Sequence, residues 1–98
     1  MRDFIEGLAI ADKKKVVALL KRTGDHGLPV NEEKFKKLQG YDLWEFKSYQ
    51  VRLMCFLYGD DIVILTHGFR KQRNKTPRTE IERALRIKKE YLEGRSKI

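Results

Sequence analysis

The sequence is poor in cysteine and histidine, and this excludes two common kinds of site. With only one cysteine, Cys55, the chain cannot form an internal disulfide. The two histidines, His26 and His67, are far apart in the sequence, so the spacing typical of zinc ligands is missing. We therefore expect chemistry that needs no metal and no cofactor.

Long apolar runs and several catalytic motifs are also missing. The first eight residues, MRDFIEGL, contain three charges and so lack the apolar core of a signal peptide, and no run is long enough to span a bilayer. We expect a cytoplasmic protein. The absence of a glycine-rich phosphate loop, a nucleophile elbow and paired carboxylates argues against most hydrolase classes.

What the sequence has in excess is positive charge. The 98 residues, 41% of them hydrophobic, predict a single domain over residues 1–98 with a net charge of +8. Residues 45–98 carry +6 of this charge, and residues 70–78 contain five cations and no anion. Such a segment binds phosphate backbones by releasing counterions, but charge alone is equally consistent with a solvated basic loop.

The first 40 residues are predicted to contain helical segments and a loop, GDHGLPVN. Apolar residues have helical spacing over residues 2–8 and again in a segment for which Asp12 is a candidate N-cap. Two helices, or one bent helix, are thus predicted to precede Gly24. A short helix is then expected to begin at Asn31 and to end at Gly40.

From Leu43 the apolar residues recur with a period of two, which predicts a strand. Trp44 and Phe46 lie on its apolar side, and Glu45 and Lys47 lie on the other. A second strand is predicted over residues 51–58 and a third over residues 62–69, joined by a turn at 59–61. One face of the second strand is wholly apolar and is predicted to face the core: Val51, Leu53, Cys55 and Leu57.

The pairing register of this hairpin decides where His67 points, and the sequence leaves two alternatives. A pair between Tyr58 and Ile62 places His67 on the core face. A pair between Gly59 and Ile62 places it instead on the face of Arg52.

A C-terminal helix is predicted after the basic loop. Thr76 is the candidate N-cap, Pro77 occupies the first helical position, and Gly94 is expected to end the helix. Its apolar stripe comprises Ile81, Ala84, Leu85, Tyr91 and Leu92.

Arg52 is the most informative candidate for function, because it projects from the strand face opposite the apolar one. It is expected to line a cationic surface for a phosphate chain together with Lys47, Arg70, Lys71 and Arg73. The alternative is an arginine that extends to solvent or pairs with Glu45.

Other residues have an ordinary structural interpretation beside a functional one. His67 is either a packed strand histidine or a proton-transfer residue. Tyr91 fits the apolar stripe, although its hydroxyl is also within reach of the sheet edge. Tyr49 either stacks on a base or closes the sheet edge. Cys55 and Trp44 are predicted to lie in the core.

A small, basic domain without metal ligands is suited to RNA binding or to RNA cleavage by the substrate's own 2′-hydroxyl. That reaction needs a group to accept the 2′-OH proton, cations around the phosphate and a proton donor for the leaving 5′-oxygen. Lysine, arginine and histidine side chains are sufficient for these tasks.

Three segments resemble the HigB-like, phage-associated branch of the RelE toxin superfamily. These are LWEFK, YQVRLMCFLYGDDIVILTHGFRK and KTPRTEIERALRIKKEYL, and the similarity extends over residues 38–91. The landmarks occur in family order: a Leu-Trp-Glu strand ending in a basic residue, a strand arginine, His-Gly-Phe with two basic residues, and Lys-Thr-Pro before a Glu-Ile helix.

The resemblance implies an α+β fold of RelE type, with N-terminal helices packed on one face of a small twisted antiparallel sheet and a C-terminal helix. It implies a ribosome-dependent endonuclease that cleaves messenger RNA, the toxin of a type II toxin–antitoxin pair. The implied partners are messenger RNA, the ribosome and a helix-turn-helix antitoxin similar to HigA.

Family positions transfer to particular residues. The strand arginine corresponds to Arg52, and Arg70 and Lys71 correspond to the basic pair after His-Gly-Phe, which is expected to bind the RNA backbone or to assist proton transfer. His67 and Tyr91 are further catalytic candidates. Four further residues are expected to bind RNA: Lys47, Arg73, Lys75 and Arg78.

The chain also departs from the family pattern. The family usually has a strand before the first helix, and this sequence begins with a helical segment, so either that strand is missing or the true start lies upstream. A lysine, Lys47, replaces the first-strand arginine. A domain that binds nucleic acid or a partner without catalysis is the alternative function. For a catalyst, Arg52→Ala should abolish toxicity and spare ribosome affinity, whereas for a binding domain it should only weaken affinity.

Overall fold

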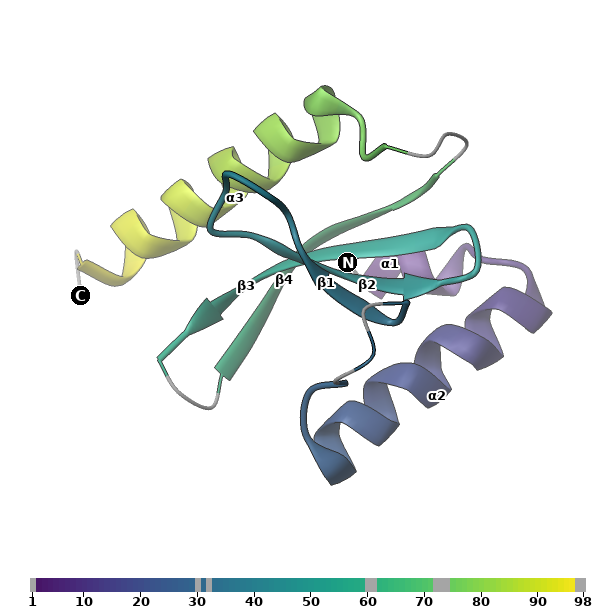
Figure 1. Ribbon diagram of the computed structural model, residues 1–98. Helices are drawn as coiled ribbons and strands as arrows, with labels where there is room; N and C mark the ends of the chain where they lie inside the picture. Colours follow the sequence, from purple (N-terminus) through teal and green to yellow (C-terminus); the bar gives the residue numbers. More distant parts are fainter. Residues whose placement is uncertain (1, 30, 32, 60–61, 72–74, 97–98) are drawn as a thin grey trace.

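The computed structural model describes residues 2–29, 31, 33–59, 62–71 and 75–96 (Figure 1). Its elements in chain order are α1 (Arg2–Glu6), α2 (Ile10–His26), β1 (Phe35–Lys37), β2 (Trp44–Ser48), β3 (Val51–Tyr58), β4 (Ile62–Arg70) and α3 (Arg78–Ser96). This confirms the expected α+β fold with N-terminal helices, an antiparallel sheet and a C-terminal helix.

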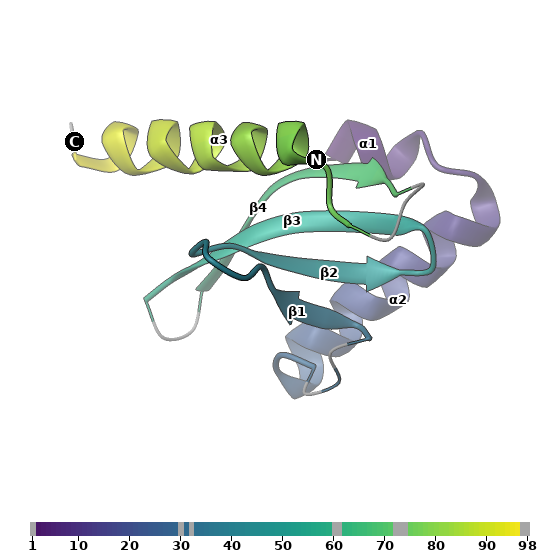
Figure 2. The same cartoon turned by 45° about the horizontal axis from the view of Figure 1, so that its top comes forward.

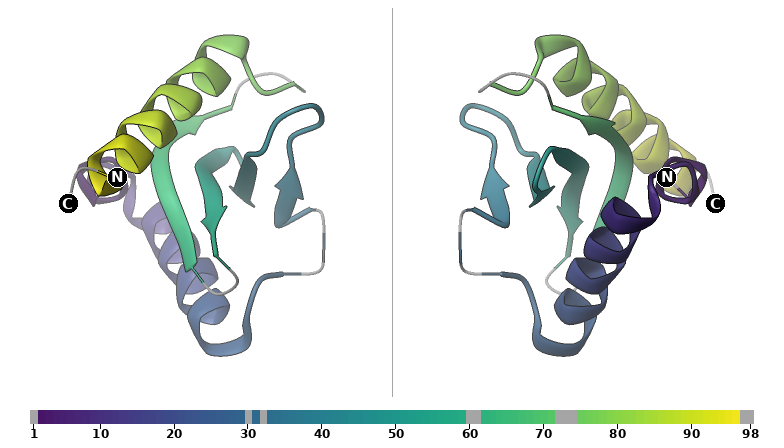
Figure 3. Two further views of the ribbon diagram at one scale, coloured as in Figure 1. Left: turned by 90° about the vertical axis from the view of Figure 1, so that its left-hand side faces the viewer. Right: turned by 90° about the vertical axis from the view of Figure 1, so that its right-hand side faces the viewer.

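The four strands form an antiparallel sheet in the order β1-β2-β3-β4. Figure 2 shows α3 beside β4, with β1 at the far edge of the sheet. In the two views of Figure 3, α2 and α3 lie next to β4 and run in different directions. The helices pack on opposite faces of the sheet and so create two separate apolar cores.

The larger core lies between the sheet and the helices α1 and α2. Its buried members are Val16, Leu19, Phe35, Phe46, Val51, Leu53 and Cys55. The predicted core face of β3 is thus confirmed for Val51, Leu53 and Cys55, but the prediction is wrong for Leu57, which is exposed near the end of the strand. Trp44 packs against this core, and its ring stacks on Phe35 at 5.0 Å between centroids.

The smaller core lies on the opposite face, beneath α3. Met54 and Phe56 from β3 pack there with Ala84 of α3 and with Leu38 and Leu43. The helix α3 contacts β3 and β4. The part of this sheet face formed by β1 and β2 therefore lies outside the smaller core. This arrangement positions the candidate site.

The hairpin of β3 and β4 combines the two predicted registers. It begins with the pair Tyr58–Ile62, as a three-residue turn requires. A β-bulge then follows between Met54 and Cys55, because Cys55 pairs with Leu65 whereas Met54 pairs with His67. The extra residue moves His67 to the face of Arg52.

Gly68 explains how α1 reaches the sheet. A Cβ atom at this position would overlap the ring of Phe4 and would touch Leu53. The Phe4 ring occupies the space that any other residue would fill. His67 and Gly68 therefore lie on opposite faces of the sheet, His67 facing α3 and Gly68 facing α1.

Several predictions for the first 40 residues are wrong. Asp12 is not the N-cap of α2, which begins at Ile10, and the helix passes through Gly24 to end at His26. The segment from Asn31 contains a turn followed by the strand β1, not a helix. Phe35 adopts the extended conformation because its ring packs against Trp44 and Phe46.

The ends of α3 also differ from the prediction. The helix begins at Arg78, after Pro77, and continues past Gly94 to Ser96. The Thr76 hydroxyl donates a hydrogen bond to Glu45 in place of the predicted capping role. No helix among the described residues is long and apolar enough to cross a membrane.

Candidate functional site

Cations gather on the sheet face that α3 only partly covers. The register places Lys47 of β2 beside Arg52 of β3 and Lys36 of β1 beside Glu45 of β2. Alternate residues of a strand share a face, so these four side chains project from the same side of the sheet. Three cations thus surround one carboxylate.

Lys71 brings a fourth cation to this surface. It follows β4, and its backbone N–H donates to the Gln50 carbonyl at 2.7 Å, which holds it beside the turn between β2 and β3. Its side chain is half-buried. The sequence prediction that Lys71 and Arg52 share a surface agrees with this geometry.

The electrostatic surroundings of Lys71 favour proton transfer. Burial lowers the pKa of its ammonium group below the usual lysine range, and Glu45 opposes this effect. The neighbouring cations lower the pKa further: Arg52, Lys47 and Lys36. A lysine with a lowered pKa is neutral more often near neutral pH, as a general base must be.

Glu45 is an acidic residue at the centre of the basic surface. Its side chain is 2% exposed, and its Oε2 accepts a hydrogen bond from the Thr76 hydroxyl at 2.9 Å. Burial of a carboxylate is costly without such partners and nearby cations. Glu45 therefore ties the segment before α3 to the sheet and lies within electrostatic reach of Lys71.

Arg52 is fixed by the backbone of its own turn. Its Nη1 donates to the carbonyl of Tyr49 and, at 3.0 Å, to that of Val51. Its Nε is buried and has no hydrogen-bond partner among the described residues. The alternative ion pair with Glu45 does not occur in the described part of the chain, so the guanidinium charge is not neutralised by that carboxylate.

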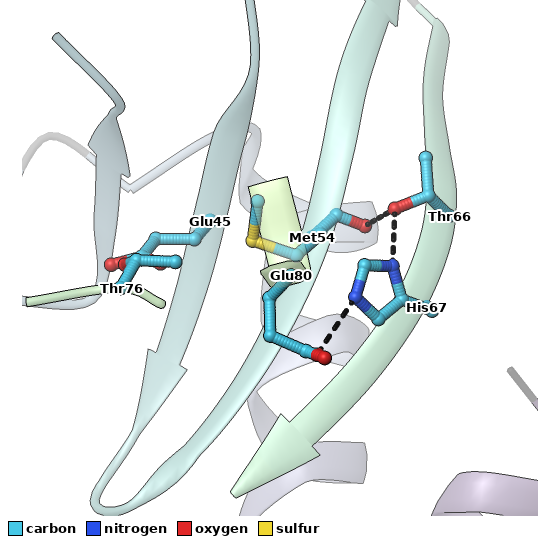
Figure 4. Close-up of polar contacts among 6 residues, drawn as sticks. All are labelled: Glu45, Met54, Thr66, His67, Thr76 and Glu80. Atoms are coloured by element: carbon cyan, nitrogen blue, oxygen red, sulfur yellow. Dashed lines mark hydrogen bonds and ion pairs between the residues drawn. The ribbon is translucent and has the colours of Figure 1, made fainter. Parts of the chain in front are cut away.

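His67 lies on the Arg52 face but beneath the first turn of α3 (Figure 4). Its side chain is almost fully buried, with Nε2 3.1 Å from Glu80 Oε2 and Nδ1 3.2 Å from Thr66 Oγ1. Burial lowers the pKa of the imidazole, and the carboxylate of Glu80 opposes this effect. This geometry favours the packed strand histidine over a proton-transfer residue at the surface.

Arg70 points away from Lys71. Its Nη2 forms an ion pair with Asp12 Oδ2 of α2 at 2.7 Å, on the face of the larger core. Arg70 pairs with Val51, a core residue of that same face. The structure thus separates the predicted basic pair instead of bringing it together at one site.

The remaining candidates lie at the margins of this surface. Lys75 is exposed, and Arg78 forms an exposed ion pair with Glu82 within α3. The Tyr91 ring packs edge-on against Phe56 at 5.7 Å between centroids, in agreement with the core interpretation. Arg73 lies outside the described residues.

Sequence reasoning missed Lys36 and underrated Glu45. The sequence gives no sign of Lys36, because the pattern from Asn31 to Gly40 predicts a helix, although Phe35, Lys36 and Lys37 form a strand. For Glu45 the available signal was its place between Trp44 and Phe46. Because alternate residues of a strand share a face, this position predicts that the Glu45 side chain lies on the same face as Lys47, and therefore that a carboxylate lies within the cluster of cations.

Two comparisons with known proteins bear on this site. No curated protein matches the chain. The family described as phage derived protein Gp49-like (DUF891) matches residues 3–89, which include every element up to most of α3. The chain therefore belongs to this Gp49-like family, which is a RelE/toxin-like family.

Proposed function

We propose that this chain is the toxin of a type II toxin–antitoxin pair, similar to HigB, and that it cleaves messenger RNA in the ribosomal A site. One observation carries the proposal. A lysine with a lowered pKa, Lys71, lies beside Arg52 within a cluster of cations on the open side of the sheet. Membership of a toxin-like family supports it.

The proposed reaction uses the 2′-hydroxyl of the RNA as nucleophile. The 2′-oxygen forms a bond to phosphorus, the bond from phosphorus to the 5′-oxygen breaks, and the products are a 2′,3′-cyclic phosphate and a 5′-hydroxyl. One proton leaves the 2′-oxygen and one reaches the 5′-oxygen. The protein supplies a proton acceptor and positive charge around the phosphate, and water supplies the proton that the leaving 5′-oxygen takes up.

Each residue of the surface has a part in this scheme. Lys71 accepts the 2′-OH proton in its neutral form, and Arg52 stabilises the negative charge that develops on the phosphate. Lys36, Lys47 and Lys75 hold the RNA backbone. Arg70 has no part, because its guanidinium is occupied by Asp12 on the other face.

The same charge distribution accounts for the proposed partners. Exposed cations such as Arg78, and Arg73 in the basic segment, supply affinity for ribosomal RNA through counterion release. A helix-turn-helix antitoxin neutralises the toxin by covering the Arg52 surface with acidic residues or by displacing α3.

The experiment is induced expression in a bacterial host, with growth recorded and the 5′ ends of messenger RNA mapped. We expect growth arrest and new ends in phase with codons for the parent chain, and neither for Arg52→Ala. Arg86→Ala is the matched control, because it removes one arginine from the exposed surface of α3. It should remain toxic.

A ribosome-binding assay separates a catalyst from a binding domain. For a catalyst, Arg52→Ala should pellet with ribosomes nearly as well as the parent, although messenger RNA stays intact. Normal growth and intact messages with well-expressed, folded parent protein would refute the toxin proposal. A loss of ribosome affinity in proportion to one charge, without any cleavage by the parent, would identify a basic binding domain.

A further inference from the structure

A basic groove lies beside the candidate site, between α2, the segment before β1 and the end of β2. It has a volume of about 470 Å³. Lys15 and Arg22 line it from α2, and Lys34 and Lys47 line it from the sheet side, with Glu33 as its acidic residue. The Lys47 side chain projects toward the Arg52 face, so Lys15, Arg22 and Lys34 are the cations of the groove itself, and with one carboxylate they still give it a positive potential that attracts a polyanion.

Tyr49 forms the end of the groove nearest the site. Its side chain is 73% exposed, and the Nζ of Lys15 lies 3.9 Å from the ring centroid, over one face of the ring. The large exposed fraction gives a second planar group access to the ring. An exposed aromatic ring among cations is the usual platform on which proteins stack a base of a single strand.

The backbone of Tyr49 is in a conformation that a tyrosine adopts at a cost. Its φ is 57°, which makes it the only residue other than glycine with positive φ in the described part of the chain. Glycine or asparagine adopts this region more easily. Strain of this kind often marks a functional position, and here the strained residue is the one that presents its ring to the groove.

The groove is continuous with the candidate site through two shared residues. Lys47 lines the groove and also pairs with Arg52 across the strands. The carbonyl of Tyr49 accepts a hydrogen bond from the Arg52 guanidinium. A strand whose phosphate lies at Arg52 therefore has a charged path around the end of β2 to α2.

We infer that this groove is a subsite for single-stranded RNA, which holds the nucleotides next to the cleaved bond. Lys15, Arg22 and Lys34 contact phosphates, and one base stacks on Tyr49. This inference rests on the proposed function, because it takes RNA as the ligand of the Arg52 surface. An acidic protein segment would match the charge of the groove but would leave the exposed ring without a stacking partner.

The test measures binding without cleavage. Fluorescence anisotropy would give the affinity of the parent for 2′-O-methyl oligonucleotides of three and nine residues, which lack the nucleophile. The nonamer should bind more tightly, because only it extends from Arg52 into the groove. Tyr49→Asn removes the ring and suits a positive φ, so it should weaken nonamer binding roughly tenfold and spare the trimer.

Charge variants test the phosphate contacts. Lys15→Ala and Arg22→Ala should each lower the slope of log affinity against log salt for the nonamer by about 0.7, the value for one contact with a single strand. Lys13→Ala is the matched control, because two helical residues place its side chain about 200° around α2 from Lys15. It should leave the slope nearly unchanged. Thermal melting would verify that each variant is folded.

The outcomes distinguish this inference from the proposed function. Equal binding of trimer and nonamer, no binding of either, or groove variants that behave like Lys13→Ala would overturn it. So would a polyglutamate competitor that displaces the nonamer at lower concentration than unlabelled RNA. If the groove variants lose nonamer binding but the parent cleaves no messenger RNA in cells, the RNA subsite would be supported and the endonuclease proposal would be refuted.

Discussion

At the scale of single residues, His67 shows how burial decides the state of a titratable group. A neutral imidazole carries one ring proton, and the carboxylate of Glu80 can only accept it, so the proton resides on Nε2. The Thr66 hydroxyl then has one proton for two acceptors at 3.2 Å, His67 Nδ1 and the Met54 carbonyl. Protonation of Nδ1 would turn this acceptor into a donor and rearrange the contact.

Because burial lowers its pKa in the folded state, His67 should make stability depend on pH. The unfolded chain binds the proton more readily, so stability is fully present above the unfolded pKa, near 6.5, and declines as the pH falls toward the folded value. We expect the melting temperature to fall between pH 7.5 and 5.5. His67→Gln should reduce this fall, although the variant is less stable at neutral pH.

His26→Gln is the matched control, because His26 is exposed at the end of α2. Melting curves followed by circular dichroism at several pH values would provide the comparison. An equal fall in melting temperature for the parent and His67→Gln would contradict the role given to burial.

At the scale of elements, the sequence predicts those whose pattern is carried by local periodicity. The strand β3 was predicted with its observed bounds because eight residues alternate between two faces. The strand β1 was missed because three residues contain no readable period, and its extended form depends on distant rings, such as Trp44 against Phe35. The bulge that moves His67 also has no local sequence signal, because the turn sequence is compatible with both the Tyr58–Ile62 and the Gly59–Ile62 pairing.

The candidate site follows the same division. Arg52 and Lys47 were placed together correctly because the alternation of their strands fixes their face. Arg70 and Lys71 were grouped by adjacency, but consecutive residues at the end of a strand point to opposite faces. The ion pair with Asp12, which is 58 positions away in the sequence, and the pairing with Val51 identify the side on which Arg70 lies.

Two glycines should respond in opposite ways to substitution by alanine. Gly68→Ala places a methyl group where Phe4 packs, so we expect a loss of roughly 1–3 kcal/mol in the free energy of unfolding. Gly24→Ala meets no atom within 4 Å and lies inside α2, so a gain of up to about 1 kcal/mol is expected. Urea unfolding followed by circular dichroism measures both. A Gly68→Ala variant as stable as the parent would show that α1 does not pack closely on β4.

At the scale of the whole molecule, the sheet separates the larger core, which stabilises the fold, from the residues proposed to cleave RNA. One face carries the larger core, the helices α1 and α2, and the ion pair of Arg70 with Asp12. The other carries α3 and, beside it, the cations around Glu45. The contact between Thr76 and Glu45 ties the start of α3 to this second face, so displacement of α3 would expose a buried carboxylate among the cations.

This separation predicts different effects for two adjacent substitutions. Arg70→Ala removes a partly exposed ion pair, so it should cost about 0.2–1 kcal/mol of stability and leave cleavage within a few-fold of the parent. Lys71→Met keeps the apolar stem and removes the amine, so it should reduce cleavage by roughly 10²–10⁴-fold with little change in melting temperature. Purified ribosomes programmed with a defined message would report cleavage. If Arg70→Ala lost as much cleavage as Lys71→Met while remaining folded, Arg70 would belong to the site, and the sheet would not divide stability from function as its two faces imply.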